Sequence, residues 1–217
     1  MDDADQAAAY AAADFSRSDR ALVSRLLDLA APHGPGPAIV DLGCGPGNIS
    51  FLLAERCPAS AVLGLDGAAA MLALAERRRR RDPGRWPSLA FAQRCLPLAD
   101  AERTALQGRF TAIVSNSLLH HLHKPSVLWQ AVLQLGCAGA LVHIHDLRRP
   151  ADPAELEAIV QRHAATASPL LRRDFAASLR AAFRVEEVRL QLREAGLDCL
   201  QVRQREDRYL EVHGRLP

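Results

Sequence analysis

The sequence predicts an α/β fold built on a mostly parallel sheet, and three observations predict it. After residue 37, short apolar runs alternate with helical stretches, which is typical of βαβ units. A glycine-rich turn joins the first apolar run to the first helical stretch. Near residue 206, two strand patterns are separated only by Glu206 and Asp207, which indicates an antiparallel pair at the end of the sheet. A chain of 217 residues suits one compact domain of this class.

The first part of the chain supplies five strands and the helices between them. The apolar or β-rich segments expected to be strands are 38–42, 61–66, 89–93, 110–116 and 138–146. The helical patterns between them cover 48–56, 68–80, 100–107 and 125–135. The alternation ends after Pro150, where three helical patterns follow one another at 153–167, 169–182 and 185–195. The final strand pair follows at 198–205 and 208–214. The third of these helices ends at Gly196, a residue that commonly follows a helix end. We interpret the helices within 153–182, with an N-terminal helix before Pro32, as a lid over one end of the sheet.

The composition excludes several enzyme classes before any motif is considered. The 27 basic residues are 26 arginines and a single lysine, Lys124. Because Lys124 follows His123, no Gly-Lys-Ser/Thr phosphate loop is present. A pyridoxal-phosphate enzyme would have only Lys124 for its Schiff base. A dehydrogenase with a Tyr four residues before a Lys is also excluded, because residue 120 is His.

The sequence also bears on the compartment. No stretch approaches the roughly 18 to 20 apolar residues of a membrane span. The acidic start, Met1 to Asp5, is unlike a secretory signal. The five cysteines are odd in number and form no CxxC pair, which suits a reducing compartment and argues against a disulfide framework or a structural zinc. We expect a cytoplasmic protein without a membrane segment.

The most informative motif is the strand, glycine turn and helix of residues 39–48. Its glycines, Gly43, Gly45 and Gly47, allow a tight turn and a close approach of the backbone to a ligand. Their GxGxG spacing differs from the GxGxxG of dinucleotide binders. Asp41 precedes the turn, and Asp66 ends the second strand, where a carboxylate can accept hydrogen bonds from ribose hydroxyls. The alternative is a structural glycine turn with a helix-capping acid.

Three segments together carry a family resemblance: residues 41–47, Asp66 followed by Met71 and Leu72, and residues 115–122. They resemble the class I S-adenosylmethionine-dependent methyltransferases, in particular small stand-alone members that methylate metabolites. The resemblance covers about residues 36–150 strongly and the remainder in element order. It implies a Rossmann-like, seven-stranded sheet, mostly parallel with an antiparallel terminal strand. It also implies helices on both faces, a helical lid, and S-adenosylmethionine as the cofactor.

The resemblance further implies the residues that bind this cofactor. The glycine turn would line the methionine moiety, Asp41 would lie near its amino group, Asp66 would bind the ribose, and Asn116 would lie beside the sulfonium. The full expected set is Tyr10, Asp41, Gly43, Cys44, Gly45, Gly47, Asp66, Gly67, Met71, Gln93, Cys95, Leu96 and Asn116. The sequence departs from the family around adenine: residues 91–97 contain no acidic residue, so that Gln93 or the backbone of 94–96 would substitute, and Gly67 replaces a larger apolar residue. Tyr10 and Phe15 either close over the ligands or pack the lid.

On this reading, the whole chain, residues 1–217, is one methyltransferase domain with four parts. We expect N-terminal lid helices at 1–36, a cofactor-binding core at 37–147, a helical insertion over the active site at 148–183, and a C-terminal helix and strand pair at 184–217.

The candidates for a general base are five histidines near the ends of the fourth and fifth strands: His120, His121, His123, His143 and His145. Because those two strands are neighbours in this fold, the loop at 120–123 and the end of the fifth strand converge. We predict a base at His120 or His121, with Asp146 orienting it or contacting the substrate. The alternatives are ordinary polar histidines, or a metal site, which no Glu or Cys spacing supports; we therefore assign no metal. Asp174, Phe175 and Ser178 share one helical side and either face the acceptor or serve core and capping roles.

The run Arg77–Arg81, with Arg85, raises the question of nucleic acid binding. A solvated helix end explains it, because the net charge is only +2 and just 10 aromatic residues are available for base stacking. The sequence therefore predicts S-adenosylmethionine-dependent methyl transfer, by in-line displacement, to O, N, S or C of a small molecule. We expect a monomer or homodimer without nucleic acid or membrane partners. The alternatives are a non-catalytic cofactor-binding or regulatory subunit, and an RNA or protein methyltransferase.

Overall fold

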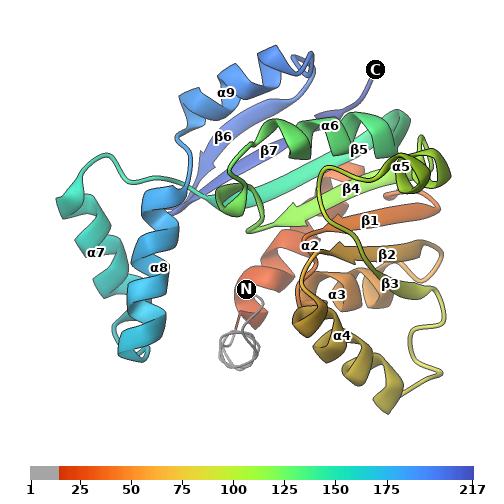
Figure 1. Cartoon of the computed structure of the whole chain (residues 1–217), viewed down its shortest axis with the longest axis horizontal. Helices are drawn as coiled ribbons and strands as arrows, with labels where there is room; N and C mark the ends of the chain where they lie inside the picture. Colours follow the sequence, from red (N-terminus) through yellow and green to blue (C-terminus); the bar gives the residue numbers. More distant parts are fainter. Residues whose placement is uncertain (1–14) are drawn as a thin grey trace.

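The computed structural model describes residues 15–217, in which seven strands form one sheet (Figure 1). The strands are β1 (Ala38–Leu42), β2 (Ala61–Asp66), β3 (Leu89–Gln93), β4 (Phe110–Asn116), β5 (Gly136–Leu147), β6 (Gln201–Arg205) and β7 (Tyr209–Arg215). Their order across the sheet is β3-β2-β1-β4-β5-β7-β6. Strands β1 to β5 pair in parallel, and β7 is antiparallel to both β5 and β6. The α/β, mostly parallel fold is confirmed; the reversed strand is the penultimate one, with β6 at the edge.

The helices follow the expected sequence of elements. They are α2 (Ser16–Ala30), α3 (Asn48–Arg56), α4 (Ala69–Arg81), α5 (Asp100–Leu106), α6 (Ser126–Leu135), α7 (Pro153–Ala164), α8 (Pro169–Ala181) and α9 (Val185–Glu194). A short 3-10 helix, η1 (Leu119–His121), was not expected. Strand β6 begins three residues later than the pattern indicated, because the Leu200 N–H donates to the Leu197 carbonyl and forms a turn there.

Both faces of the sheet are covered by helices, as a parallel sheet requires. Along β1, Ile39 faces the core beneath α2 and α3, whereas Val40 and Leu42 face the core beneath α6 and α9. Each face is closed by fully buried side chains, such as Phe51 of α3 on one side and Trp129 of α6 on the other. The sheet is therefore a rigid platform whose strand ends position the site.

Helices α7 and α8 form a hairpin beyond the carboxyl ends of β4 and β5 (Figure 1). Each has a clear start signal: Asp152 and Ser168 cap the two helices by accepting hydrogen bonds from backbone N–H groups, and a proline follows each cap. The hairpin has its own small core, in which Leu156, Ile159 and Leu179 pack against Leu147 at the end of β5. This arrangement matches a lid over one end of the sheet.

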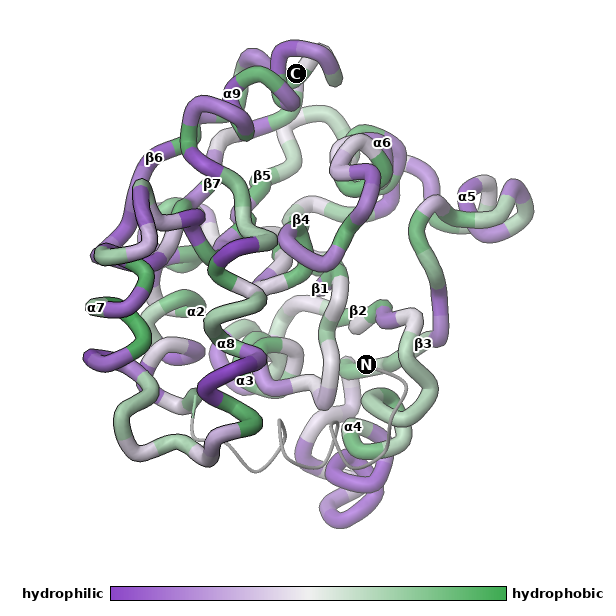
Figure 2. The backbone as a smooth tube through the Cα atoms, turned by 60° about the vertical axis from the view of Figure 1, so that its left-hand side comes forward, coloured by the Kyte–Doolittle hydropathy of each residue, from purple (hydrophilic) through white to green (hydrophobic). Residues whose placement is uncertain are grey.

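The arginine run lies at the hydrophilic end of α4 (Figure 2). Arg79 and Arg80 pair with Glu76 on the same helix, and the Arg78 guanidinium lies 4.1 Å from the Phe51 ring centroid. These local contacts are those of a solvated helix end. None of the helices within residues 15–217 has the length and apolarity that a bilayer crossing requires.

Candidate functional site

The glycine turn after β1 leaves an open space beside Gly45. Gly43, Gly45 and Gly47 all have positive φ angles, of 70°, 53° and 84°, which other residues rarely adopt. A Cβ at Gly43 would lie 2.9 Å from the Leu118 side chain, and one at Gly47 would lie 2.8 Å from Phe91, so packing also demands glycine at both positions. A Cβ at Gly45 would meet no atom within 4 Å. The loop is thus packed at both ends and free in the middle.

Asp66 connects this loop to the end of β2. Its Oδ2 accepts a hydrogen bond from the Gly45 N–H, and its Oδ1 accepts one from the Ala68 N–H, both at 2.8 Å. A carboxylate has about four acceptor positions, so Asp66 retains capacity for ligand hydroxyls. The Gln93 side-chain amide donates to the Gly67 carbonyl at 3.1 Å, which places the end of β3 beside the same turn.

Asp41 lies beneath the loop and is buried. Its Oδ2 accepts a hydrogen bond from the Ser50 hydroxyl at 2.6 Å. Burial, together with the nearby carboxylates of Asp66 and Asp19, raises the pKa of Asp41 to about 7, although the hydrogen bond from Ser50 acts to lower it. The site therefore has a buried carboxyl that would favour a nearby positive charge.

The other predicted cofactor residues fall into two groups. Cys44 and Met71 are buried, and burial raises the pKa of the Cys44 thiol, so these two support the loop from within. Cys95 and Leu96 lie after β3, and a Cβ at Gly67 would lie 3.1 Å from Cys95 Sγ. Tyr10 lies outside the described residues.

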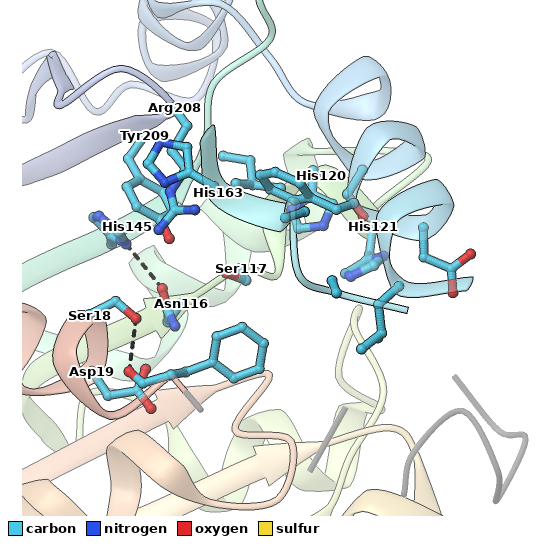
Figure 3. A pocket seen from close by; sticks show the side chains of 18 of the residues that line it. Ser18, Asp19, Asn116, Ser117, His120, His121, His145, His163, Arg208 and Tyr209 are labelled. Carbon is cyan, nitrogen blue, oxygen red and sulfur yellow. Dashed lines mark hydrogen bonds between the residues drawn. The ribbon is translucent and has the colours of Figure 1, made fainter. Parts of the chain in front are cut away.

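A cavity of about 380 Å³ lies at the carboxyl ends of β4 and β5, between α2 and the α7–α8 hairpin (Figure 3). Its polar and aromatic lining residues are Phe15, Ser18, Asp19, Asn116, Ser117, His120, His121, His145, His163, Asp174, Phe175, Ser178, Arg208 and Tyr209. The structure therefore brings together the strand-end residues and the lid residues. The cavity adjoins the cofactor loop, because Gly43 packs on Leu118, two residues after Asn116.

His120 and Asp146 form a buried pair at this cavity. His120 Nδ1 lies 2.6 Å from Asp146 Oδ1. The Leu119 N–H donates to Asp146 Oδ2 and the Leu147 N–H to Asp146 Oδ1, both at 2.7 Å, so the carboxylate is held rigidly. An ionised carboxylate only accepts, which makes Nδ1 the protonated nitrogen and leaves Nε2 as an acceptor.

The other histidines differ in their surroundings. His145 Nδ1 lies 3.1 Å from Asn116 Oδ1, and burial lowers the pKa of His145 to about 4, so this ring is neutral at pH 7. The centroid of the His121 ring lies 4.0 Å from that of the His120 ring. Desolvation, and to a lesser extent the neighbouring His120, lowers the pKa of His121. His123 is exposed and does not line the cavity, and His143 is buried against Glu211. Within residues 15–217, no group of three or more metal-ligating side chains is arranged to hold an ion.

The sequence reasoning did not identify His163, Arg208 and Tyr209 as cavity residues. His163 comes from α7, Tyr209 is the first residue of β7, and Arg208 immediately precedes that strand. The signal available for the latter pair was the antiparallel turn at 206–207. A strand that runs against β5 begins where β5 ends, so its first residues belong to the same edge as the site.

Comparison with known proteins addresses the core of the chain. Residues 39–136 match the family described as "Methyltransferase domain". This match covers a little less than half of the chain. A trans-aconitate 2-methyltransferase of Deinococcus radiodurans is 37% identical over 103 residues, which cover 48% of this chain and 35% of that protein. Another of the same name, from Methylobacterium nodulans, is 38% identical over 114 residues, covering 52% and 38%. The chain thus spans less than half the length of these curated relatives.

Solved structures resemble a much larger part of the chain. A SAM dependent methyltransferase from Aquifex aeolicus has a TM-score of 0.66 at 14% identity and covers 99% of both chains. The plantazolicin methyltransferase BamL, solved in complex with a triazolic desmethylPZN analog and SAH, has a TM-score of 0.67 at 14% identity over 93% of this chain and 86% of its own. At these identities the likeness concerns the fold. Together with the domain match, it confirms the resemblance to class I S-adenosylmethionine-dependent methyltransferases.

Proposed function

We propose that this protein is an S-adenosylmethionine-dependent methyltransferase that methylates a small molecule bound under the α7–α8 hairpin. The observation that carries the proposal is the closeness of the open glycine turn to the cavity, since both lie where β1 and β4 end. A cavity of about 380 Å³ has the size of a small-molecule site. When bound, the cofactor supplies an electrophilic methyl group on a sulfonium, and the sulfur departs as a neutral thioether when the methyl group is transferred.

The residues present fit this cofactor. The space beside Gly45 admits the methionine moiety, and Asp66 retains acceptor positions for ribose hydroxyls. Asp41, buried below the turn, favours a cationic amino group. Asn116, beside His145 at the cavity, would face the reacting end of the cofactor, whereas Gly67, Gln93 and Cys95 would flank its adenine.

The His120–Asp146 pair supports an acceptor that must lose a proton. Asp146 holds His120 with its Nδ1 protonated, so Nε2 can take a proton from a hydroxyl in the cavity. A carboxylate oxygen, as acceptor, is already ionised at neutral pH and would need no such base. We therefore infer a hydroxyl oxygen as the methyl acceptor, with orientation in the cavity contributing the larger part of the rate.

The proposal is tested by calorimetry and by turnover. Wild-type protein should bind both S-adenosylmethionine and S-adenosylhomocysteine. Asp66→Asn should weaken binding about tenfold or more, because it removes a charged acceptor, and Gly45→Val should block the open space. Asp82→Asn, on an exposed residue at the end of α4, is the matched control.

Methyl transfer is then followed with a labelled methyl donor and a collection of small hydroxy compounds. A protein that binds neither cofactor form contradicts the proposal. Cofactor binding without turnover on any compound or cell extract would instead favour a non-catalytic role.

A further inference from the structure

We propose that Arg208 is the acceptor anchor and that the acceptor carries a carboxylate group. This inference rests on the proposed function, since it assigns the substrate class of the same cavity. Arg208 immediately precedes β7 and lines the cavity, together with Tyr209 and Phe175 (Figure 3).

Several basic side chains near Arg208 have acidic partners. Arg148 pairs with Glu155 at 2.5 Å, and Arg149 pairs with Glu187. Arg162 and His163 both pair with Asp207, at 2.5 and 2.9 Å. These ion pairs neutralise the hinge between β5 and α7 and the turn before β7, where acids are plentiful.

Arg208 is different. Among residues 15–217, no carboxylate lies within ion-pair distance of its guanidinium, and its buried Nε has no hydrogen-bond partner. A partly buried cation without an acidic partner is unfavourable, and so is a buried donor left without a hydrogen bond. A ligand anion in the cavity would supply the missing partner.

Two aromatic rings hold the guanidinium in place. Its central carbon lies 4.8 Å from the Tyr209 ring centroid and 5.9 Å from that of Phe175. Stacking of this kind restrains the plane of the guanidinium and leaves its N–H edge available. That edge matches a carboxylate, which it can bind through two parallel hydrogen bonds.

The remaining charges of the cavity agree with a single carboxylate at this end. Figure 3 shows Arg208 and His163 together and well separated from Asp19, which lies at the start of α2. The other acid, Asp174, lies 3.7 Å from Arg173. The single guanidinium of Arg208 can balance the charge of one carboxylate on the acceptor. The Tyr209 and Phe175 rings beside it suit an acceptor whose part between that carboxylate and His120 is apolar or aromatic.

The test uses full-length protein saturated with S-adenosylhomocysteine and a panel of hydroxy acids led by 4-hydroxybenzoate, each beside its methyl ester. Binding is measured by calorimetry and by the shift in melting temperature, so that it does not depend on turnover. The acids should bind and raise the melting temperature, and their esters should bind at least about tenfold more weakly, the loss expected for a charged hydrogen bond. Arg208→Gln should abolish the difference between acid and ester, and Arg208→Lys should restore part of it.

Arg205→Gln, on an exposed arginine of the same strand pair, is the control and should behave as wild type. Arg208→Gln should also keep its melting temperature without ligand and its affinity for S-adenosylhomocysteine, because Arg208 has no acidic partner among the described residues. Equal binding of acids and esters, or failure of every acid to bind, overturns the inference. Loss of S-adenosylhomocysteine binding in the wild type would instead count against the proposed function.

Discussion

Two buried histidine–carboxylate pairs each include one residue of β5, and they do different things. His143 of β5 lies 3.2 Å from Glu211 of β7, whereas His120 of η1 lies 2.6 Å from Asp146 of β5. Glu211 also accepts hydrogen bonds from the side chains of Arg25 and Arg203. Although burial acts to raise the pKa of Glu211, the hydrogen bonds from His143 and the two arginines hold it well below its ordinary value. This pair ties α2 to the last two strands.

The other pair has no arginine. Asp146 is held instead by the backbone N–H groups of Leu119 and Leu147, and the free edge of His120 belongs to the cavity. In the described part of the chain His143 Nδ1 is buried without a partner, away from the cavity. The comparison teaches that a buried histidine–carboxylate pair is not by itself a functional signal. The two pairs differ in the surroundings of the second ring nitrogen of the histidine. Where that nitrogen is buried the pair stabilises the fold, and where it faces the cavity it can take part in a reaction.

The largest effect should come from His120→Gln. Removal of a general base reduces the turnover number by about 10²–10⁴-fold, whereas the melting temperature should change little because glutamine can still donate to Asp146. Turnover with a labelled methyl donor measures it. His123→Gln, on an exposed histidine outside the cavity, is the control. An unchanged turnover number for His120→Gln would remove the base from the proposal.

The next largest effect should come from Glu211→Gln, this time on stability. The substitution leaves Arg25 and Arg203 without their acid, and because both guanidinium groups keep some access to water, the loss should be about 1–3 kcal/mol. Denaturant unfolding measures the loss. Glu186→Gln, on an exposed glutamate of α9, should change stability little. If Glu211→Gln instead lowered turnover in fully folded protein, the division between the two pairs would be wrong.

A pH effect should follow from Asp41, a third buried carboxyl that has a hydroxyl partner and no cation among the described residues. The folded pKa of Asp41, about 7, exceeds its ordinary value of 3.8, so between these pH values the folded state holds a proton that the unfolded state has lost. This contribution is fully present below about pH 4 and is lost as the pH rises to about 7, by at most about 1.4 kcal/mol per pH unit.

The free energy of unfolding of Asp41→Asn should therefore fall less than that of the wild type between pH 5 and pH 8. Urea titrations at several pH values, with the exposed Asp28→Asn as control, measure the slope. Identical slopes in wild type and Asp41→Asn would contradict the raised pKa.

The smallest effect should come from Arg203→Gln. The Arg203 side chain is 44% exposed, and Glu211 keeps Arg25 and His143, so the loss should be up to about 1 kcal/mol. Denaturant unfolding beside Glu211→Gln gives the ratio of the two effects. Losses of equal size would mean that Arg203 alone balances Glu211.

The parts of the fold and site that the sequence predicted depend on neighbouring residues or on neighbouring parallel strands. The glycine turn and Asp66 were found because their conformations are encoded within a few residues. The convergence of His120 and Asp146 followed from two parallel strands ending at one edge. Their roles in catalysis and cofactor binding remain predictions.

The rest required tertiary packing. His163 reaches the cavity only because the α7–α8 hairpin packs on Leu147, and no local pattern fixes that angle. His143 and His145 share one face of β5, yet α2 and Glu211 enclose the first and the cavity opens at the second. Such differences depend on which helix covers each strand end. The alternation of side chains along a strand tells which residues share a face, but it does not tell what packs against that face.

The reversal of β7 has a practical consequence for anyone handling this protein. Because β7 begins beside the cavity and runs toward the opposite end of the sheet, residue 217 lies far from the start of β7 (Figure 1). A purification tag, fluorophore or surface tether attached at residue 217 should therefore leave the mouth of the cavity unobstructed. An insertion in the turn at 206–208 would instead displace Arg208, which we expect to bind the carboxylate of the acceptor.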